Sequence, residues 1–178
     1  IYWDPSSFVG ENDFNNEEIM SLIKNSVDLR MQADVDIANF LSGGIDSTSI
    51  IKIASKNNNL NTFSMSINQS SYDESKWFNL VSNKFDTNHK TINLDSQNLK
   101  KETILESINV FDEPYSDPST IPSYILSKEI SNNYKVAISG DGGDEIFGGY
   151  ERMKIVLQNN NFVLSSLSNL YNFYPAYL

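Results

Sequence analysis

Cysteine is absent from this chain of 178 residues, and histidine occurs once. Without cysteine there can be no disulfide scaffold, no thiolate zinc site and no cysteine nucleophile, and one histidine cannot build a His-rich metal site. Long apolar runs are missing too, since no stretch approaches the roughly 20 residues of a membrane span and no cleavable signal pattern opens the sequence. We therefore expect a cytoplasmic protein with no membrane partner.

Basic residues are also scarce: 13 lysines and arginines stand against 23 aspartates and glutamates, which gives a net charge of −10. An acidic chain of this kind disfavours nucleic acid as a partner. If it handles phosphate groups, it needs a divalent cation between them and its own carboxylates. Hydrophobic residues make up 39% of the sequence, so a chain of this length can bury a core and form one domain of ordinary size.

Short apolar runs alternate with segments of helical periodicity. The expected strands are residues 35–41, 61–67, 89–94 and 135–139, and the expected helices are residues 15–31, 47–56, 73–85, 97–111 and 121–130. This alternation predicts βαβ crossovers and a parallel sheet. The predicted fold class is α/β, an open parallel sheet of about five strands with helices on both faces.

We expect the chain to divide into three parts. Residues 1–33 form an N-terminal arm and a helix, whose start is marked by Asn15 and Glu18 as in a capping box. Residues 34–152 form the core of the domain. Residues 153–178 begin a C-terminal helical region, and because its apolar face has no later partner in this sequence, we expect the natural protein to continue.

Two glycine-rich turns each follow an apolar run: Ser42-Gly43-Gly44-Ile45-Asp46-Ser47 and Ser139-Gly140-Asp141-Gly142-Gly143-Asp144-Glu145. Glycine lets the backbone approach a ligand closely, and the N–H groups that begin a helix attract phosphate. Both turns lie at the carboxyl ends of expected strands, where ligands bind in open parallel sheets. The two turns therefore predict one phosphate site with a carboxylate from each.

The first turn alone fits a tight connection as well as a phosphate site. The carboxylate of Asp46 together with the hydroxyls of Ser42 and Ser47 favours the phosphate site over a simple connection. Hydroxyls donate to phosphate oxygens, and a carboxylate beside phosphate is usually accompanied by Mg²⁺. The lysine of the Walker loop and the glycine spacing of the Rossmann motif are both missing, which disfavours those classes of protein.

The first turn resembles the pyrophosphate-binding loop of the ATP pyrophosphatases, which cleave ATP to AMP and pyrophosphate. The second, with its continuation to Tyr150, resembles the synthetase domain of glutamine-hydrolysing asparagine synthetases. Residues 72–75 and 112–114 also look like that family's pattern. The resemblance runs from about residue 2 to residue 150 and implies a sheet of the adenine nucleotide alpha hydrolase type.

This resemblance implies roles for particular residues. The residues placed at ATP are Leu41, Ser42, Gly43, Gly44, Asp46, Ser47, Met65, Ser139 and Gly140. Asp46 and Asp144 match the family's Mg²⁺-ligating aspartates, and both count as catalytic together with Asp141. Asp141, where some members carry glutamate, would take a proton from the attacking ammonia.

The implied reaction activates the side-chain carboxylate of aspartate as β-aspartyl-AMP. Ammonia from glutamine then attacks, giving asparagine, AMP and pyrophosphate. The implied partners are a small-molecule carboxylate, ammonia, and a glutaminase domain on a missing N-terminal part or on a separate chain, with a homodimer as a candidate assembly. No counterpart of the glutaminase domain is seen in the sequence, so this chain alone is not expected to hydrolyse glutamine.

Three alternatives remain open. Pro118 lies near the place where some members carry arginine in the substrate region, so another carboxylate, such as a sugar acid of surface-polysaccharide synthesis, could be the substrate. A tRNA-modifying or NAD-synthesising enzyme shares the first motif, but the second motif disfavours it. An inactive nucleotide-binding fragment is the third, and the retention of Asp46 and Asp144 speaks against it. His89 is expected to be structural rather than catalytic.

Overall fold

The computed structural model describes residues 15–56, 59–67, 73–95, 99–111, 113, 117, 119–151 and 153. They belong to two compact units, Ile1–Ile138 and Ser139–Leu178, and each is described by itself. Residues 1–14 of the expected N-terminal arm and residues 154–178 of the expected C-terminal helical region lie outside the described residues, as do Tyr72, Asp112, Pro114 and Pro118. In the part of the chain that the structure describes, no helix is both long and apolar enough to cross a membrane.

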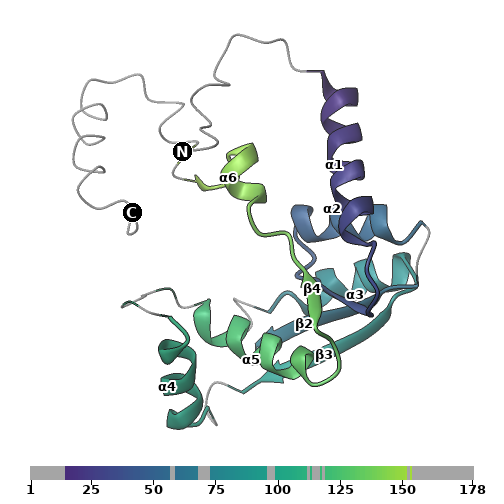
Figure 1. Ribbon diagram of the computed structural model, residues 1–178. Helices are drawn as coiled ribbons and strands as arrows, with labels where there is room; N and C mark the ends of the chain where they lie inside the picture. The colour runs from purple at the N-terminus through teal and green to yellow at the C-terminus, as the bar shows by residue number, and fades with distance from the viewer. Residues whose placement is uncertain are drawn as a thin grey trace, which may run out of the picture. The chain divides into compact units, whose positions relative to one another are not determined.

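The first unit is built on a parallel sheet (Figure 1). Its strands are β1 (Ile37–Phe40), β2 (Asn61–Ile67), β3 (Asn88–Leu94) and β4 (Val136–Ile138). They lie in the order β3-β2-β1-β4, and every neighbouring pair is parallel. The predicted α/β class is confirmed, with four strands among the described residues where about five were expected. From β1 the chain builds the sheet toward β3 and then returns to add β4 on the other side of β1.

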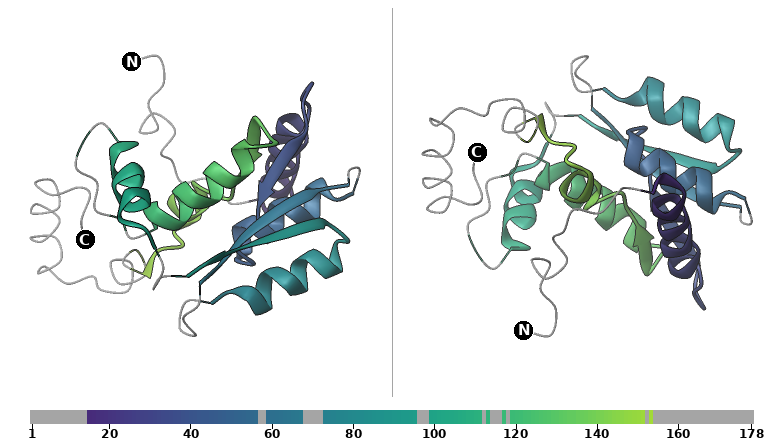
Figure 2. Two further views of the ribbon diagram at one scale, coloured as in Figure 1. Left: turned by 90° about the horizontal axis from the view of Figure 1, so that it is seen from below. Right: turned by 90° about the horizontal axis from the view of Figure 1, so that it is seen from above.

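Helices cover both faces of this sheet, as predicted, and Figure 2 shows α3 and α5 on opposite sides of it. The helices of the first unit are α1 (Asn16–Arg30), α2 (Ile45–Ala54), α3 (Ser75–Lys84), α4 (Lys101–Asn109) and α5 (Thr120–Ser131). On one face, Val27 of α1, Ile51 of α2 and Phe78 of α3 share a buried cluster. On the other, Leu126 of α5 packs in a second cluster with Phe63 of β2.

The start of α1 follows the sequence pattern. The side-chain oxygen of Asn15 accepts hydrogen bonds from the backbone N–H groups of Glu17 (3.0 Å) and Glu18 (3.4 Å). These bonds satisfy donors that the first helical turn leaves open. On the predicted apolar face of the helix Val27 is buried, and Ile23 packs against the same cluster. Asn15 is therefore the helix cap that the sequence predicts.

The apolar face of α3 differs from the prediction. In the expected helix at residues 73–85, the apolar residues at helical spacing are Trp77, Leu80, Val81 and Phe85, and these predict its buried face. In the structure, however, Trp77 is 53% exposed and Leu80 is 54% exposed. Val81 is buried as predicted, and Phe78, which the pattern left out, is buried beside it. Phe78, Val81 and Phe85 are three and four residues apart, which makes them one narrow stripe toward the sheet, whereas Trp77 and Leu80 lie outside that stripe on one side of it.

One face of β2 carries hydroxyl groups rather than apolar side chains. Thr62, Ser64 and Ser66 alternate along the strand and so share a face, opposite the one that holds Phe63. Thr62 and Ser64 are 0% and 1% exposed. Buried hydroxyls need hydrogen-bond partners, because leaving one unpaired costs about 1–3 kcal/mol. The partners of this row come from three different segments of the chain, described below.

Thr62 is paired with the one histidine. His89 lies opposite Thr62 in the register of β2 and β3, and its Nδ1 is 2.9 Å from the Thr62 hydroxyl oxygen. Its Nε2 is 3.2 Å from the hydroxyl oxygen of Thr91, and its ring lies against Phe78 with centroids 5.4 Å apart. Burial lowers the pKa of His89. The imidazole thus takes part in packing α3 on the sheet, near the amino ends of the strands.

We expect the free energy of unfolding to fall as the pH drops below the ordinary histidine pKa of about 6.5. The reason is that the unfolded chain binds a proton to His89 in the window between that value and the lowered pKa of the folded state, while the folded chain does not. His89→Asn should flatten this part of the pH dependence. Urea unfolding of both proteins between about pH 5 and 7.5 measures it, and equal slopes in the two proteins would contradict the assignment.

Candidate functional site

Leu41, the residue before the first glycine-rich turn, is bound to β2 through both its N–H and its carbonyl group. The backbone N–H of Leu41 donates to the carbonyl of Phe63 (2.9 Å), which extends the pairing one residue beyond β1. The hydroxyl of Ser64 donates to the carbonyl of Leu41. Both backbone groups of Leu41 are therefore occupied, and the chain enters the turn from a fixed position.

Hydroxyl groups close the turn itself. The hydroxyl oxygens of Ser42 and Ser47 are 3.0 Å apart, within hydrogen-bond distance. The N–H of Gly44 donates to Ser42 Oγ (3.2 Å), and Ser47 Oγ donates to the carbonyl of Gly44 (3.3 Å). Helix α2 starts at Ile45, two residues earlier than predicted, so Asp46 and Ser47 both lie in its first turn.

The start of α2 is suited to an anion. Among the described residues, no side chain caps its first turn. The N–H groups of such a turn have no partner within the helix, and they carry the positive end of the helix dipole. Asp46 adds a partly exposed carboxylate at the same place. Phosphate oxygens and a bridging cation match this combination of donors and negative charge.

Gly43 is required by both backbone conformation and space. Its φ is +86°, a region that favours glycine. A Cβ at this position would lie 2.6 Å from the Cβ of Trp77 and 2.7 Å from the backbone N of Phe78. The sequence predicted a glycine that lets a ligand approach, and it did not predict that the first turn of α3 packs against Gly43. No local pattern could have revealed this contact, because the two segments are distant in the chain.

The strand order gives this turn its place in the sheet. Strands β1 and β4 are neighbours, with Asn39 opposite Ile138. The first turn follows β1, and Ser139 follows β4 directly in the chain. Strand order reverses between these two strands, and ligands of open α/β sheets bind outside the carboxyl ends at such a reversal. Met65 lies near the carboxyl end of β2, packed against the α5-side cluster.

The second unit holds the second turn, which leads into α6 (Gly143–Phe147). The Ser139 hydroxyl donates to the Asp141 carboxylate (2.9 Å), and the N–H of Asp141 is 3.4 Å from the Ser139 oxygen. Gly142 has a φ of +90° and precedes the helix, whose first turn contains Asp144. The backbone of Gly149 lies against the Asp144 side chain, so this glycine leaves room for the carboxylate.

The structure thus gathers the predicted site residues into two groups. Leu41 and residues 42–47 form one, in the first unit, and Ser139, Gly140, Asp141 and Asp144 form the other, in the second unit. A joint magnesium site of Asp46 and Asp144 stays a prediction. No cluster of three or more metal-ligating side chains occurs among the described residues. One or two carboxylates with phosphate oxygens is the usual Mg²⁺ arrangement at a nucleotide, and the donors present fit that arrangement.

Asp73 belongs to the pattern at residues 72–75 that resembles the family, but sequence reasoning gave it no individual role. It lies just before α3 and close in the chain to the residues that touch Gly43. Its carboxylate accepts hydrogen bonds from the hydroxyl and the N–H of Ser75 and from the hydroxyl of Ser66. These bonds, those from Ser75 first, lower the pKa of Asp73. An aspartate two residues before a serine at a helix start is the signal from which this hydrogen-bonding role could have been predicted.

A parallel sheet whose glycine turn opens a helix beside the reversal of strand order defines an α/β domain of the phosphate- and nucleotide-binding class. The model of the asparagine synthase family matches residues 18–173, and the chain belongs to that family. The resemblance drawn from the two turns is therefore confirmed.

Individual relatives of the chain also carry the name of this family. A putative glutamine-hydrolyzing asparagine synthetase 2 of Methanocaldococcus jannaschii is 35% identical over 137 residues, covering 75% of this chain and 26% of the relative. The glutamine-hydrolyzing asparagine synthetase 1 of Bacillus subtilis is 35% identical over 150 residues, covering 79% and 22%. The chain thus spans about a quarter of the length of these relatives. A solved structure, the NMN synthetase from Francisella tularensis, is 21% identical with a TM-score of 0.48, covering 78% of this chain and 59% of that structure's chain.

We expect Gly43→Ala to destabilise the protein more than Gly142→Ala. Both glycines have a positive φ, but a Cβ at Gly142 would meet nothing within 4 Å, whereas a Cβ at Gly43 would clash with the backbone of α3. The expected losses in free energy of unfolding are about 1 kcal/mol for Gly142→Ala and at least about 2 kcal/mol for Gly43→Ala. Urea unfolding measures both. Equal losses would show that the contact with α3 contributes nothing.

Proposed function

We propose that the chain is the ATP-dependent amidating domain of a glutamine-dependent carbon–nitrogen ligase, which activates a carboxylate as an acyl-adenylate. The observation that carries the proposal is the turn at residues 42–47, an uncapped helix start with a carboxylate beside it, in a member of the asparagine synthase family. This turn offers backbone N–H groups to the β,γ-pyrophosphate of ATP. Leu41 and Met65 would contact the adenine.

The carboxylates fit a magnesium complex of ATP. The Asp46 carboxylate would repel the triphosphate unless a cation stood between them, and the net charge of −10 on the chain adds to that repulsion. Asp46 would hold Mg²⁺ in this role together with Asp144. When bound, the ion would neutralise charge on the phosphate oxygens and on the departing pyrophosphate. The hydroxyls of Ser42 and Ser47 bond to the turn and to each other, and each can donate to a phosphate oxygen instead by turning its hydrogen away from its present acceptor.

The proposed reaction has two displacements. An oxygen of the substrate carboxylate attacks the α-phosphorus of ATP, and pyrophosphate leaves. Ammonia then attacks the acyl carbon, and AMP leaves with the former carboxylate oxygen. Asp141 would accept the proton that the ammonia nitrogen gives up, and the hydrogen bond from the Ser139 hydroxyl orients its carboxylate. Positioning and charge stabilisation supply most of the catalysis in such a site.

We propose the side chain of aspartate as the carboxylate and ammonia released from glutamine as the nucleophile. The names of the relatives support both choices. Sugar acids are the alternative substrate, which the position of Pro118 in the sequence favours.

The direct test is carboxylate-dependent exchange of labelled pyrophosphate into ATP in the presence of Mg²⁺. We expect the intact protein to catalyse this exchange when aspartate is added and not when it is omitted, because adenylation is reversible. Parallel reactions with uronic acids test the alternative. Exchange with a uronic acid alone would replace aspartate as the substrate, and an absence of exchange with every acid would overturn the ligase assignment.

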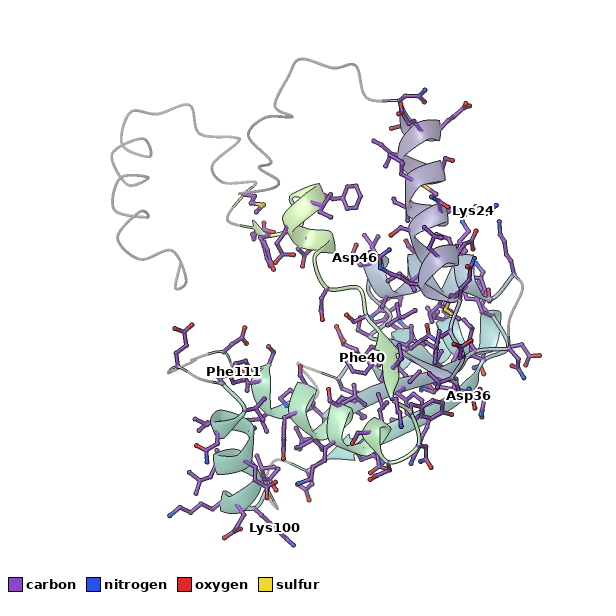
Figure 3. The ribbon with its side chains drawn as sticks, viewed as in Figure 1. Lys24, Asp36, Phe40, Asp46, Lys100 and Phe111 are labelled. Atoms are coloured by element: carbon purple, nitrogen blue, oxygen red, sulfur yellow. The ribbon has the colours of Figure 1, made fainter. Side chains whose placement is uncertain are left out.

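We expect Asp46→Asn to weaken binding of Mg²⁺·ATP at least tenfold, about 1.4 kcal/mol, because the amide cannot serve as an anionic ligand of the cation. Isothermal titration calorimetry measures this affinity. Asp36→Asn is the matched control: Asp36 is exposed and precedes β1, whereas Asp46 follows it (Figure 3), and the same charge is removed. The control should stay within about twofold of the parent. Unchanged affinity in Asp46→Asn would contradict a metal role.

A further inference from the structure

The hydroxyl row of β2, Thr62, Ser64 and Ser66, joins the sheet to the surroundings of the nucleotide turn. Ser64 donates to the carbonyl of Leu41, the residue that enters the turn. Ser66, two residues further along the same face, donates to Asp73 Oδ1 (3.2 Å). The strand therefore holds the beginning of the turn through one hydroxyl and the residue before α3 through the next.

Asp73 links β2 to the first residue of α3. Its Oδ1 accepts from both Ser66 Oγ and the backbone N–H of Ser75 (3.1 Å), so a single oxygen bridges the strand and the helix. Its Oδ2 accepts from the Ser75 hydroxyl at 2.8 Å. Ionised carboxylates make stronger hydrogen bonds than neutral acceptors do, so this bridge is stronger than a hydroxyl pair would be.

The first turn of α3 transmits this position to Gly43. The N–H groups of Trp77 and Phe78 donate to the carbonyl of Glu74 at 2.8 and 3.2 Å, which closes the helical turn that starts beside Asp73. The same two residues form the surface against which Gly43 lies, with no room for a Cβ between them. Any shift of this end of α3 must therefore move Gly43 or open a gap beside it.

We propose that Asp73 is a positioning residue for the pyrophosphate-binding turn: by joining Ser66 of β2 to Ser75 of α3, it sets the surface that fixes the backbone of Gly43. The inference rests on the proposed function, since it assigns Asp73 a part in holding the phosphates of ATP. Ser64 fixes where the turn begins, and Asp73 fixes its middle through α3. The N–H groups that follow Gly43 depend on both anchors for their direction.

The experiment compares Mg²⁺·ATP with AMP by isothermal titration calorimetry on the intact protein. Asp73→Ala removes the bridge and should weaken ATP binding about tenfold, and Ser66→Ala removes only the strand side of the bridge and should weaken it at least about threefold. AMP lacks the β,γ-pyrophosphate, so its affinity should stay within about twofold in both variants. Asp73→Asn keeps an oxygen that accepts from Ser66 and Ser75, and it should restore ATP affinity to within about threefold of the parent.

Asn15→Ala is the matched control, because it removes a side chain that accepts the same kind of N–H bond at the start of α1, away from the turn. It should lower the thermal stability of the protein without changing the ATP affinity. Equal weakening of ATP and AMP in Asp73→Ala would show a general structural role and overturn the proposal. Unchanged ATP binding in Ser66→Ala would also overturn it, since Asp73 would then act as a helix cap only.

The parent protein separates the two assignments. If it binds no Mg²⁺·ATP, the proposed function fails and the positioning role fails with it. If the parent binds Mg²⁺·ATP and both Ser66→Ala and Asp73→Ala bind it equally well, the proposed function stands and only the positioning role is overturned. Should Asp73→Ala fail to fold, Ser66→Ala still decides the matter, because it removes the bond to the strand and leaves both bonds between Asp73 and Ser75 in place.

Discussion

The parallel pairing of β1 with a strand on each side is the constraint on which the first unit depends. β1 is only four residues long, yet it pairs with β2 and with β4 and carries helices on both faces. Asn39, in its middle, is fully buried. Because no freedom of register remains at β1, the residues after it enter the turn at one fixed place, beside the point where strand order reverses.

Much of the scaffold could be predicted from the sequence because it rests on local patterns. The bounds of β2 were predicted to the residue, since its β-branched and apolar residues end at clear polar breaks. β1 was predicted two residues too long at its start, because hydrophobicity cannot show that pairing begins only at Ile37 and leaves Val35 exposed. Trp77 was misplaced for a similar reason, since a helix bears apolar residues on its flanks as well as on its buried stripe.

The candidate site, like the scaffold, has features that local sequence predicts and features that it does not. Both turns were predicted from the spacing of glycines and carboxylates, because the residue types within a short segment determine its backbone conformation and its charge. The contact of Gly43 with α3 and the bridge from Ser66 to Asp73 were not predicted, because each joins segments whose approach is decided by the whole fold. Hydroxyl residues such as Ser64 look like surface residues in a sequence. Ser64 can be buried here because its hydroxyl donates to the carbonyl of Leu41.

The two faces of β2 have different tolerances for change. Phe63 and Met65 pack against apolar neighbours, where another side chain of similar volume can be accommodated by small adjustments. Ser64 and Ser66, on the reverse face, meet single acceptor atoms, where no apolar side chain of any volume serves. Within one strand, then, substitutions at Phe63 and Met65 change mainly the stability of the domain. Substitutions at Ser64 and Ser66 change the positions of the segments that these hydroxyls bind.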